Sequence, residues 1–211
     1  MMKKVGIFGG TFNPVHAGHV KAALGFIDAA GLDSLLVMPD KIPPHKVIVG
    51  EDHPEIRFHM TRLAFDEVNA DGKITVSDME LRREGKSFTY YTIKELTEAG
   101  VGELYLYCGT DMLLTFDKWF RFADILSMCT LAYAGREVQS PELQREVEGK
   151  IQMLREKYGA RILVIPLAPI ETSSSEVRER IANGEDVSHL LPPAVYEYIK
   201  EKRLYSNDTG K

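Results

Sequence analysis

Short apolar runs alternate with amphipathic segments along most of the chain. A run of about four to eight apolar residues leaves no side chain for solvent, so each run predicts a strand that is buried on both faces. The predicted strands are Val5–Phe8, Ser34–Pro39, Lys73–Leu81, Leu104–Cys108, Leu131–Ala134 and Arg161–Ile170. Buried strands that alternate with helices are typical of a parallel sheet in an α/β protein.

Apolar residues at helical spacing lie between these runs. The first predicted helix begins near Gly18 and stops at Gly31. The others are predicted at Pro54–Asn69, after Ser87, after Asp111, at Pro141–Tyr158, after Ser175 and within Leu190–Tyr205. In the Pro54–Asn69 helix the apolar residues share one face, and the polar residues on its other faces, Arg57 among them, are expected to be solvated.

Length and composition fit one domain of an ordinary globular protein. The chain has 211 residues, of which 44% are apolar and 27% charged. Its net charge of −5 argues against broad nucleic-acid binding, which usually needs a basic face. No apolar run approaches about 18 residues, so we expect neither a membrane span nor a signal peptide. A cytoplasmic location is expected instead. Cys108 and Cys129 lack CxxC spacing and are expected to be buried thiols.

A glycine-rich turn joins the first predicted strand to the first predicted helix. Gly9 and Gly10 allow positive φ and let a ligand approach backbone N–H groups, and the helix start behind them attracts phosphate. His16 and His19, three residues apart, would flank the same anion. The alternative is that both are capping or surface histidines. The turn has neither the GxxxxGK[ST] nor the GxGxxG pattern, which argues against P-loop and dinucleotide-binding proteins.

Further polar and aromatic residues stand where predicted strands end or helices begin. Lys46, in a proline-rich loop, is a candidate triphosphate ligand or a solvated charge. Asp111 follows the fourth predicted strand, where an α/β sheet binds ligands, or caps the next helix. Trp119 suits a heteroaromatic ring or belongs to the core. A serine-rich turn precedes Arg178 and repeats the anion-binding pattern, or is an N-cap with a surface arginine. Arg136 is a further candidate for phosphate.

Four motifs carry a resemblance to a known family. GGTFNPVHAGH, PPHK, GTDMLLTFDKW and TSSSEVR follow one another over nearly the whole chain. They resemble the signatures of the HxGH nucleotidyltransferases, in particular bacterial nicotinate-nucleotide adenylyltransferases. The resemblance implies a Rossmann-like, doubly wound parallel sheet in a single nucleotidyltransferase domain, residues 1–205, whose active site lies where the first and fourth strands part. Residues 206–211 are expected to form a disordered tail.

The resemblance also implies a reaction and its partners. In this family the 5′-phosphate of nicotinate mononucleotide attacks the α-phosphorus of ATP, with Mg²⁺, and pyrophosphate leaves, which is a step of NAD biosynthesis. The partners would be ATP and nicotinate mononucleotide, without nucleic acid or membrane, and a homo-oligomer is left open. No side chain is assigned to a metal.

Motif residues and the resemblance together give a set of candidate site residues. The catalytic candidates are His16, His19, Lys46 and Arg178. The candidates for ATP are Gly9, Gly10, Thr11, Phe12, Gly109, Asp111, Arg136, Ser174 and Ser175. The candidates for the mononucleotide are Lys46, Ser87, Thr89, Tyr90 and Trp119. The chain departs from the family in having Tyr91 where Asp is common, and Thr172 and Ser175 where Ile and Thr are common.

Two alternatives to this function stay open. Pantetheine-phosphate adenylyltransferase shares the HxGH and serine-rich motifs but is usually shorter and lacks the PPHK and GxDxLxxxxxW pair. A non-catalytic nucleotide sensor would bind ATP without releasing pyrophosphate. For the main hypothesis we expect nicotinate to be preferred over nicotinamide, because a site near Ser87–Tyr91 that offers only N–H and O–H donors leaves an amide NH₂ unpaired.

Overall fold

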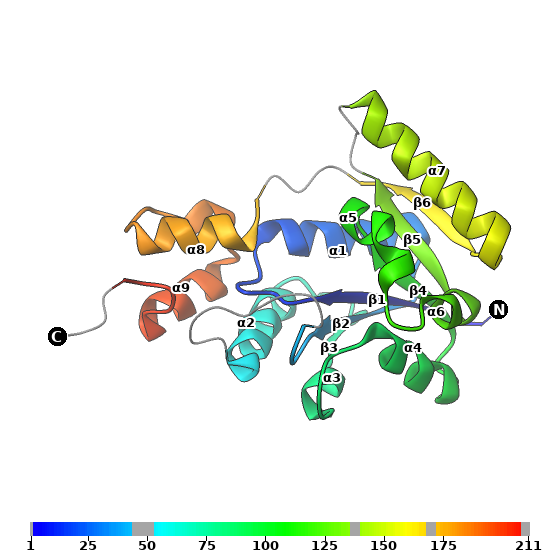
Figure 1. Cartoon of the computed structure of the whole chain (residues 1–211). Coiled ribbons are helices and arrows are strands. Elements are labelled where there is room, and N and C mark those ends of the chain that lie inside the picture. The colour runs from blue at the N-terminus through cyan, green and yellow to red at the C-terminus, as the bar shows by residue number, and fades with distance from the viewer. Residues whose placement is uncertain (1, 44–52, 136–139, 168–171, 208–211) are drawn as a thin grey trace.

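One parallel sheet forms the centre of the molecule. The computed structural model describes residues 2–43, 53–135, 140–167 and 172–207. Within these ranges the sheet has the strand order β3-β2-β1-β4-β5-β6 (Figure 1). Its strands are β1 (Lys4–Gly10), β2 (Ser34–Pro39), β3 (Ile74–Val76), β4 (Glu103–Cys108), β5 (Cys129–Gly135) and β6 (Ile162–Pro166). The parallel α/β sheet predicted from the apolar runs is thereby confirmed.

The strand order reverses at β1. Val5 of β1 pairs with Ser34 of β2 on one side and with Leu104 of β4 on the other. The chain therefore winds outward in both directions from β1, which confirms the doubly wound arrangement. In such a sheet ligands bind in the crevice beyond the carboxyl ends of the two strands that part. Here those ends are Gly10 and Cys108.

Helices cover both faces of the sheet. They are α1 (Ala17–Ala30), α2 (Pro54–Asp66), α3 (Met79–Arg82), α4 (Thr89–Glu98), α5 (Thr110–Leu114), α6 (Phe122–Met128), α7 (Pro141–Tyr158), α8 (Ser174–Ala182) and α9 (Pro193–Lys202), with 3-10 turns η1 (Phe116–Lys118) and η2 (Ser188–Leu190). Helices α8 and α9 lie at the end of the molecule opposite α7 (Figure 1). None of the described helices is long and apolar enough to cross a membrane.

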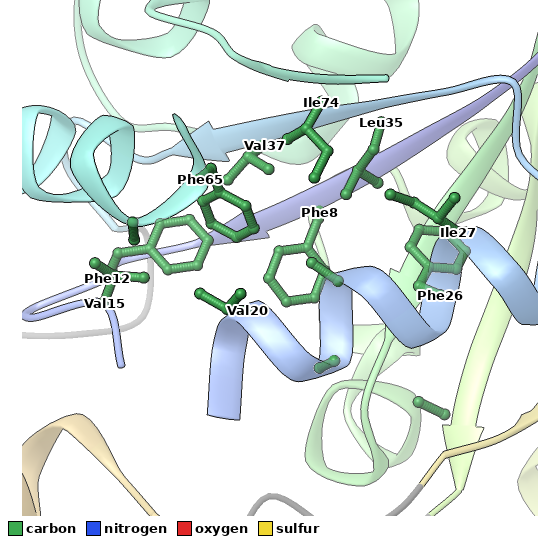
Figure 2. Close-up of a cluster of buried hydrophobic side chains, with 14 of the residues drawn as sticks. Phe8, Phe12, Val15, Val20, Phe26, Ile27, Leu35, Val37, Phe65 and Ile74 are labelled. Carbon is green, nitrogen blue, oxygen red and sulfur yellow. The ribbon is translucent and has the colours of Figure 1, made fainter. Parts of the chain in front are cut away.

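Two hydrophobic clusters lie on the two faces of the sheet. Side chains of successive strand residues point to opposite faces, so Phe8 enters one cluster and Ile7 the other. Phe8 is surrounded by residues of α1, β2 and α2, among them Val20, Val37 and Phe65 (Figure 2). Helices α4 to α7 cover the face that Ile7 enters.

The two cysteines lie in the core, as predicted. Cys108 and Cys129 are both fully buried, and neither forms a disulfide. Burial raises the pKa of both thiols. They are structural core residues of β4 and β5.

The predicted strand Lys73–Leu81 is wrong in its second half. β3 stops at Val76, and Met79 begins the short helix α3. The Ser77 hydroxyl accepts a hydrogen bond from the Met79 N–H at 3.3 Å. This local bond forms a turn in place of the backbone pairing that would continue the strand. This turn brings the residues of α3 to the edge of the sheet where the site lies.

Two other predicted boundaries also differ. The predicted helix Pro54–Asn69 ends at Asp66, because Asn69 exchanges side-chain hydrogen bonds of 2.8 Å with the N–H and C=O of Ile74 at the start of β3. The last predicted strand is shorter, Ile162–Pro166, and residues 168–170 lie outside the described part.

Candidate active site

The glycine turn lies at the carboxyl end of β1, in the crevice. Gly9 is exposed, and a Cβ at this position would meet no atom within 4 Å, so its backbone faces open space. A Cβ at Gly10 would lie 2.9 Å from the ring of Phe12. Gly10 is therefore needed for the chain to fold Phe12 back against the turn.

Phe12 packs beneath the turn, on its core side. Its φ of +50° is in the left-handed region and its side chain is only 2% exposed. The ring packs against Phe8 with 5.9 Å between centroids (Figure 2). It also lies edge-on to His19, with 5.1 Å between centroids. Phe12, a sequence candidate for ATP, thus has no side-chain surface to offer a ligand, and only its backbone is available.

His16 and His19 form a pair in ring contact at the start of α1, with their planes tilted by 32°. Their ring centroids lie 3.7 Å apart, and the backbone N–H of His16 donates to Nδ1 of His19 at 3.2 Å. His16 is 2% exposed, and its Nδ1 has no hydrogen-bond partner among the described residues. Buried polar atoms are nearly always paired, so this nitrogen points to a missing partner. Burial lowers the pKa of His16 to about 4, and the imidazole is therefore uncharged at neutral pH.

The serine-rich turn meets the glycine turn across about 160 residues of sequence. Ser174 Oγ donates to the carbonyl of Pro14 at 2.9 Å, and Arg178 Nη1 donates to the carbonyl of Asn13 at 2.5 Å. The N-cap of α8 is Ser173, whose Oγ accepts from a backbone N–H. The capping alternative therefore applies to Ser173, and Ser174 has a different function, because it ties the two turns together.

Arg178 is held by both turns. Its Nη2 donates to Ser175 Oγ at 3.2 Å, in addition to the bond from Nη1 to Asn13. A guanidinium has five N–H donors. Arg178 is half-buried, and its two bonds to described residues hold the guanidinium in place while N–H donors remain for a ligand.

A buried arginine that the sequence prediction placed in solvent holds the turn from the other side. Arg57 is 1% exposed. Its Nη1 donates to the carbonyl of Thr11 and the carbonyl of Asp40, each at 2.7 Å, and to Asp40 Oδ1 at 3.1 Å, while Nη2 donates to the carbonyl of Lys41 at 3.1 Å. Asp40 Oδ2 accepts from Thr11 Oγ1 at 2.9 Å. The guanidinium of Arg57 thereby joins the loops that follow β1 and β2.

A cavity of about 220 Å³ opens beside the glycine turn. Gly9, Gly10 and Thr11 form part of its wall. Ser87, Thr89 and Trp119, three of the sequence candidates for the mononucleotide, line it as well. One face of Trp119 stacks on the buried Phe116, with centroids 4.9 Å apart and planes at 28°. Trp119 thus belongs to the core and to the cavity wall at once.

Tyr90, the third candidate for the mononucleotide in the segment Ser87–Tyr91, does not line the cavity. Its side chain is 6% exposed and lies in the hydrophobic cluster beneath α4. The guanidinium of Arg121 stands 4.4 Å from its ring centroid. Helical geometry turns Tyr90 inward when its neighbour Thr89 faces the cavity.

A buried carboxyl group in the cavity wall was missed by the sequence analysis. Glu80 is 7% exposed, and its Oε1 accepts a 2.6 Å hydrogen bond from Thr92 Oγ1. Burial raises the pKa of Glu80, with the nearby charge of Asp40 acting in the same direction. The cavity therefore is not the donor-only site expected from the sequence. No local pattern marked Glu80, because it was assigned to a strand.

The remaining candidates lie at the edge of β4 or outside the described residues. Gly109 is the N-cap of α5, so Asp111 is not the cap, and its side chain is exposed in the first helical turn. Lys46 and Arg136 are outside the described residues. Among the residues that are described, no group of three or more His, Cys, Asp or Glu side chains could hold a metal ion.

The reversal of strand order at β1, with a glycine-rich strand end and a histidine pair at the start of α1, defines an α/β protein with a candidate phosphate-binding site. The sequence profile of the Cytidylyltransferase-like family matches residues 7–180. A probable nicotinate-nucleotide adenylyltransferase of Trichlorobacter lovleyi is 35% identical over 213 residues, covering 96% of this chain and 99% of that relative. Another, of Carboxydothermus hydrogenoformans, is 37% identical over 205 residues, covering 96% and 98%.

Solved structures share the fold. The nicotinic acid mononucleotide adenylyltransferase of Plasmodium falciparum, in complex with NaAD, superposes with a TM-score of 0.75 at 17% identity, covering 96% of this chain and 97% of its own. A putative nicotinate-nucleotide adenylyltransferase of Vibrio parahaemolyticus gives 0.65 at 19% identity, with coverages of 98% and 97%. The chain belongs to the Cytidylyltransferase-like family, and within it to the nicotinate-nucleotide adenylyltransferases.

Proposed function

We propose that the protein transfers the adenylyl group of ATP to nicotinate mononucleotide, giving nicotinate adenine dinucleotide and pyrophosphate. One observation carries the proposal: Gly9, Gly10 and Thr11, which lead from the end of β1 into the turn before the histidine pair, also line the cavity that Trp119 lines. A phosphate held at the turn and an aromatic base held in the cavity would therefore be parts of neighbouring ligands.

The reaction needs positioning and charge stabilisation from the protein. A phosphate oxygen of the mononucleotide attacks the α-phosphorus of ATP. The bond from the α-phosphorus to the oxygen that bridges to the β-phosphorus breaks, and pyrophosphate leaves with that electron pair. We assign His16 and His19 to the oxygens of the α-phosphoryl group. His16 acts there as an uncharged hydrogen-bonding group, because its pKa of about 4 keeps it neutral.

The positive charge is assigned to Arg178 and Lys46. Arg178 keeps three of its N–H donors after its bonds to Asn13 and Ser175, and these would meet the outer phosphates of ATP. Gly109 and Asp111, at the end of the neighbouring strand, are assigned to ATP as well. Arg136 and Lys46 keep the roles proposed from the sequence.

We propose Mg²⁺ as the ion that accompanies ATP. Mg²⁺ prefers oxygen ligands and is commonly held by substrate phosphates with one or two carboxylates. The exposed carboxylate of Asp111, at the carboxyl edge of the sheet, fits this donor set. When bound, the ion would neutralise charge on the triphosphate. We further propose that the protein works in the cytoplasm and independently of nucleic acid and membranes.

The cavity is assigned to the pyridine base of the mononucleotide. Trp119 offers an aromatic face to the ring, and the hydroxyl of Thr89 offers a donor to a carboxylate, while the Ser87 hydroxyl in the same wall is engaged with Glu80 and with the N–H of Lys41. Glu80 adds a carboxyl group to the same wall. We propose that the preference for nicotinate holds, with Glu80 protonated when the base is bound, so that it donates rather than accepts.

A single assay tests the function against its alternatives. The protein is incubated with ATP and Mg²⁺ together with nicotinate mononucleotide, nicotinamide mononucleotide or pantetheine phosphate, and pyrophosphate release is measured. We expect release with the two pyridine mononucleotides, faster with nicotinate. Release only with pantetheine phosphate would establish the sister activity, and ATP binding without release in all three mixtures would establish a sensor.

A further inference from the structure

The segment after α9 returns to the glycine turn at the other end of the sequence. The hydroxyl of Tyr205 donates to Oδ1 of Asn13 at 2.5 Å, a contact between residues 192 positions apart. Asn13 lies in the turn, three residues before His16. The hydrogen bond therefore links the last described segment of the chain to the residues that precede the histidine pair.

The backbone of this segment takes an unusual course to place Tyr205. Arg203 has a φ of +51° as the C-cap of α9, which is a common role, but Tyr205 also has a φ of +65°. A left-handed conformation is uncommon for a bulky residue. Ser206 Oγ donates to the carbonyl of Arg203, and Asn207 Nδ2 donates to the carbonyl of Ala182, both at 2.9 Å. These bonds hold the segment on both sides of Tyr205.

Asn13 is held at two atoms by residues from the C-terminal part of the chain. Tyr205 binds its side-chain oxygen, and Arg178 binds its backbone carbonyl. The next carbonyl, that of Pro14, accepts from Ser174. The Tyr205 hydroxyl therefore adds a restraint on the side chain of Asn13 to those on the backbone carbonyls of this part of the turn.

We propose that Tyr205 is a positioning residue, which sets the turn and thereby the orientation of His16 and His19 relative to the reacting phosphate. The inference rests on the proposed function. Displacement of a catalytic group by a fraction of an ångström lowers the rate more than it lowers the stability of the fold. One hydrogen bond contributes little to folding, so the principal effect of losing it falls on turnover.

The test compares two tyrosine-to-phenylalanine variants of the full chain. Tyr205→Phe removes the hydroxyl that binds Asn13. Tyr158→Phe is the matched control, because this side chain is 42% exposed at the end of α7 and its ring contacts only Phe122 among the described aromatic residues. We expect Tyr205→Phe to lower kcat about tenfold, with KM for ATP and for the mononucleotide changed less than about twofold, and Tyr158→Phe to keep both.

A second measurement does not depend on activity. In protein labelled at its histidine side chains, the NMR signals of His16 and His19 are assigned from their loss in His16→Ala and His19→Ala. We expect both signals to shift in Tyr205→Phe and to stay in place in Tyr158→Phe. If the unmodified protein releases no pyrophosphate with any mononucleotide, the proposed function fails, and the histidine signals still decide whether Tyr205 positions the pair.

A double-mutant cycle separates positioning through Asn13 from a general loss of packing. If Tyr205 acts through this residue, Tyr205→Phe lowers kcat no further in an Asn13→Ala background, and the two losses are not additive. Additive losses, an unchanged kcat in Tyr205→Phe, or histidine signals that stay in place would each overturn the proposal.

Discussion

Replacing Arg57 by methionine should destabilise the fold by about 3–5 kcal/mol. The side chain is 1% exposed and donates four hydrogen bonds of 2.7 to 3.1 Å, three to the carbonyls of Thr11, Asp40 and Lys41 and one to the Asp40 carboxylate. Methionine has a similar length and fills much of the space, so most of the loss comes from unpaired polar groups and not from a cavity.

The magnitude follows from the kind of group left behind. A hydrogen bond to a charged partner contributes about 1.5–3 kcal/mol, and four added independently would give about 6–12 kcal/mol, which is comparable to the whole stability of a domain, about 5–15 kcal/mol. Water can enter beside Asp40, whose side chain is 14% exposed, and satisfy part of the loss. Removing one partner of a buried ion pair costs about 3–5 kcal/mol, and this cost gives the expected loss of stability in Arg57→Met. Arg57→Lys should lose less, because one ammonium can keep the charge and some of the four acceptors.

Urea denaturation measures this prediction. The midpoint should fall while the slope of unfolding free energy against urea stays the same. Arg62→Met is the control on the same helix, because Arg62 is 58% exposed and its contact with Asp66 is 3.9 Å long, and we expect a change within about 0.5 kcal/mol. A loss below about 1 kcal/mol in Arg57→Met would refute the view that this arginine ties the two loops together.

Three further predictions concern the site. His16→Ala and His19→Ala should each lower kcat by about 10²-fold or more, while the affinity for ATP changes little. As a control, His59→Ala should leave kcat unchanged, because His59 is exposed. Near-normal turnover in both site variants would contradict the catalytic assignment. Trp119→Ala should weaken both pyridine mononucleotides about equally, so that the ratio of their kcat/KM values persists; a ratio that collapses would show that stacking sets the preference. Burial raises the pKa of Glu80 in the folded state, so the stability that Glu80 contributes is full below its unfolded pKa and is lost as pH rises through its folded pKa. The urea midpoint of Glu80→Gln should therefore improve relative to that of the unmodified protein between pH 4.5 and pH 7. A difference in midpoint that stays constant over this range would contradict the raised pKa.

Local sequence determined the elements that form the site. The apolar run at Val5–Phe8 predicted a buried strand, and β1 extends through Gly9 and Gly10, which the sequence had placed in the turn and which end the strand with backbone that a ligand can approach. The three-residue spacing of His16 and His19 placed both rings together at the start of a helix, and their centroids lie 3.7 Å apart in the structure. These features depend on neighbours within a few residues, which is why a pattern can predict them.

Only the tertiary structure decided which polar side chains are buried. Arg57 has the helical position of a solvated residue, yet its hydrogen bonds to Thr11, Asp40 and Lys41 reach loops 16 to 46 residues away. Glu80 enters the cavity because a turn ends β3 early, and Tyr205 reaches Asn13 across 192 residues. The periodicity of a sequence reports the average apolarity of a face. A buried polar group is stable only when distant segments supply its hydrogen bonds, and these segments meet only in the folded chain.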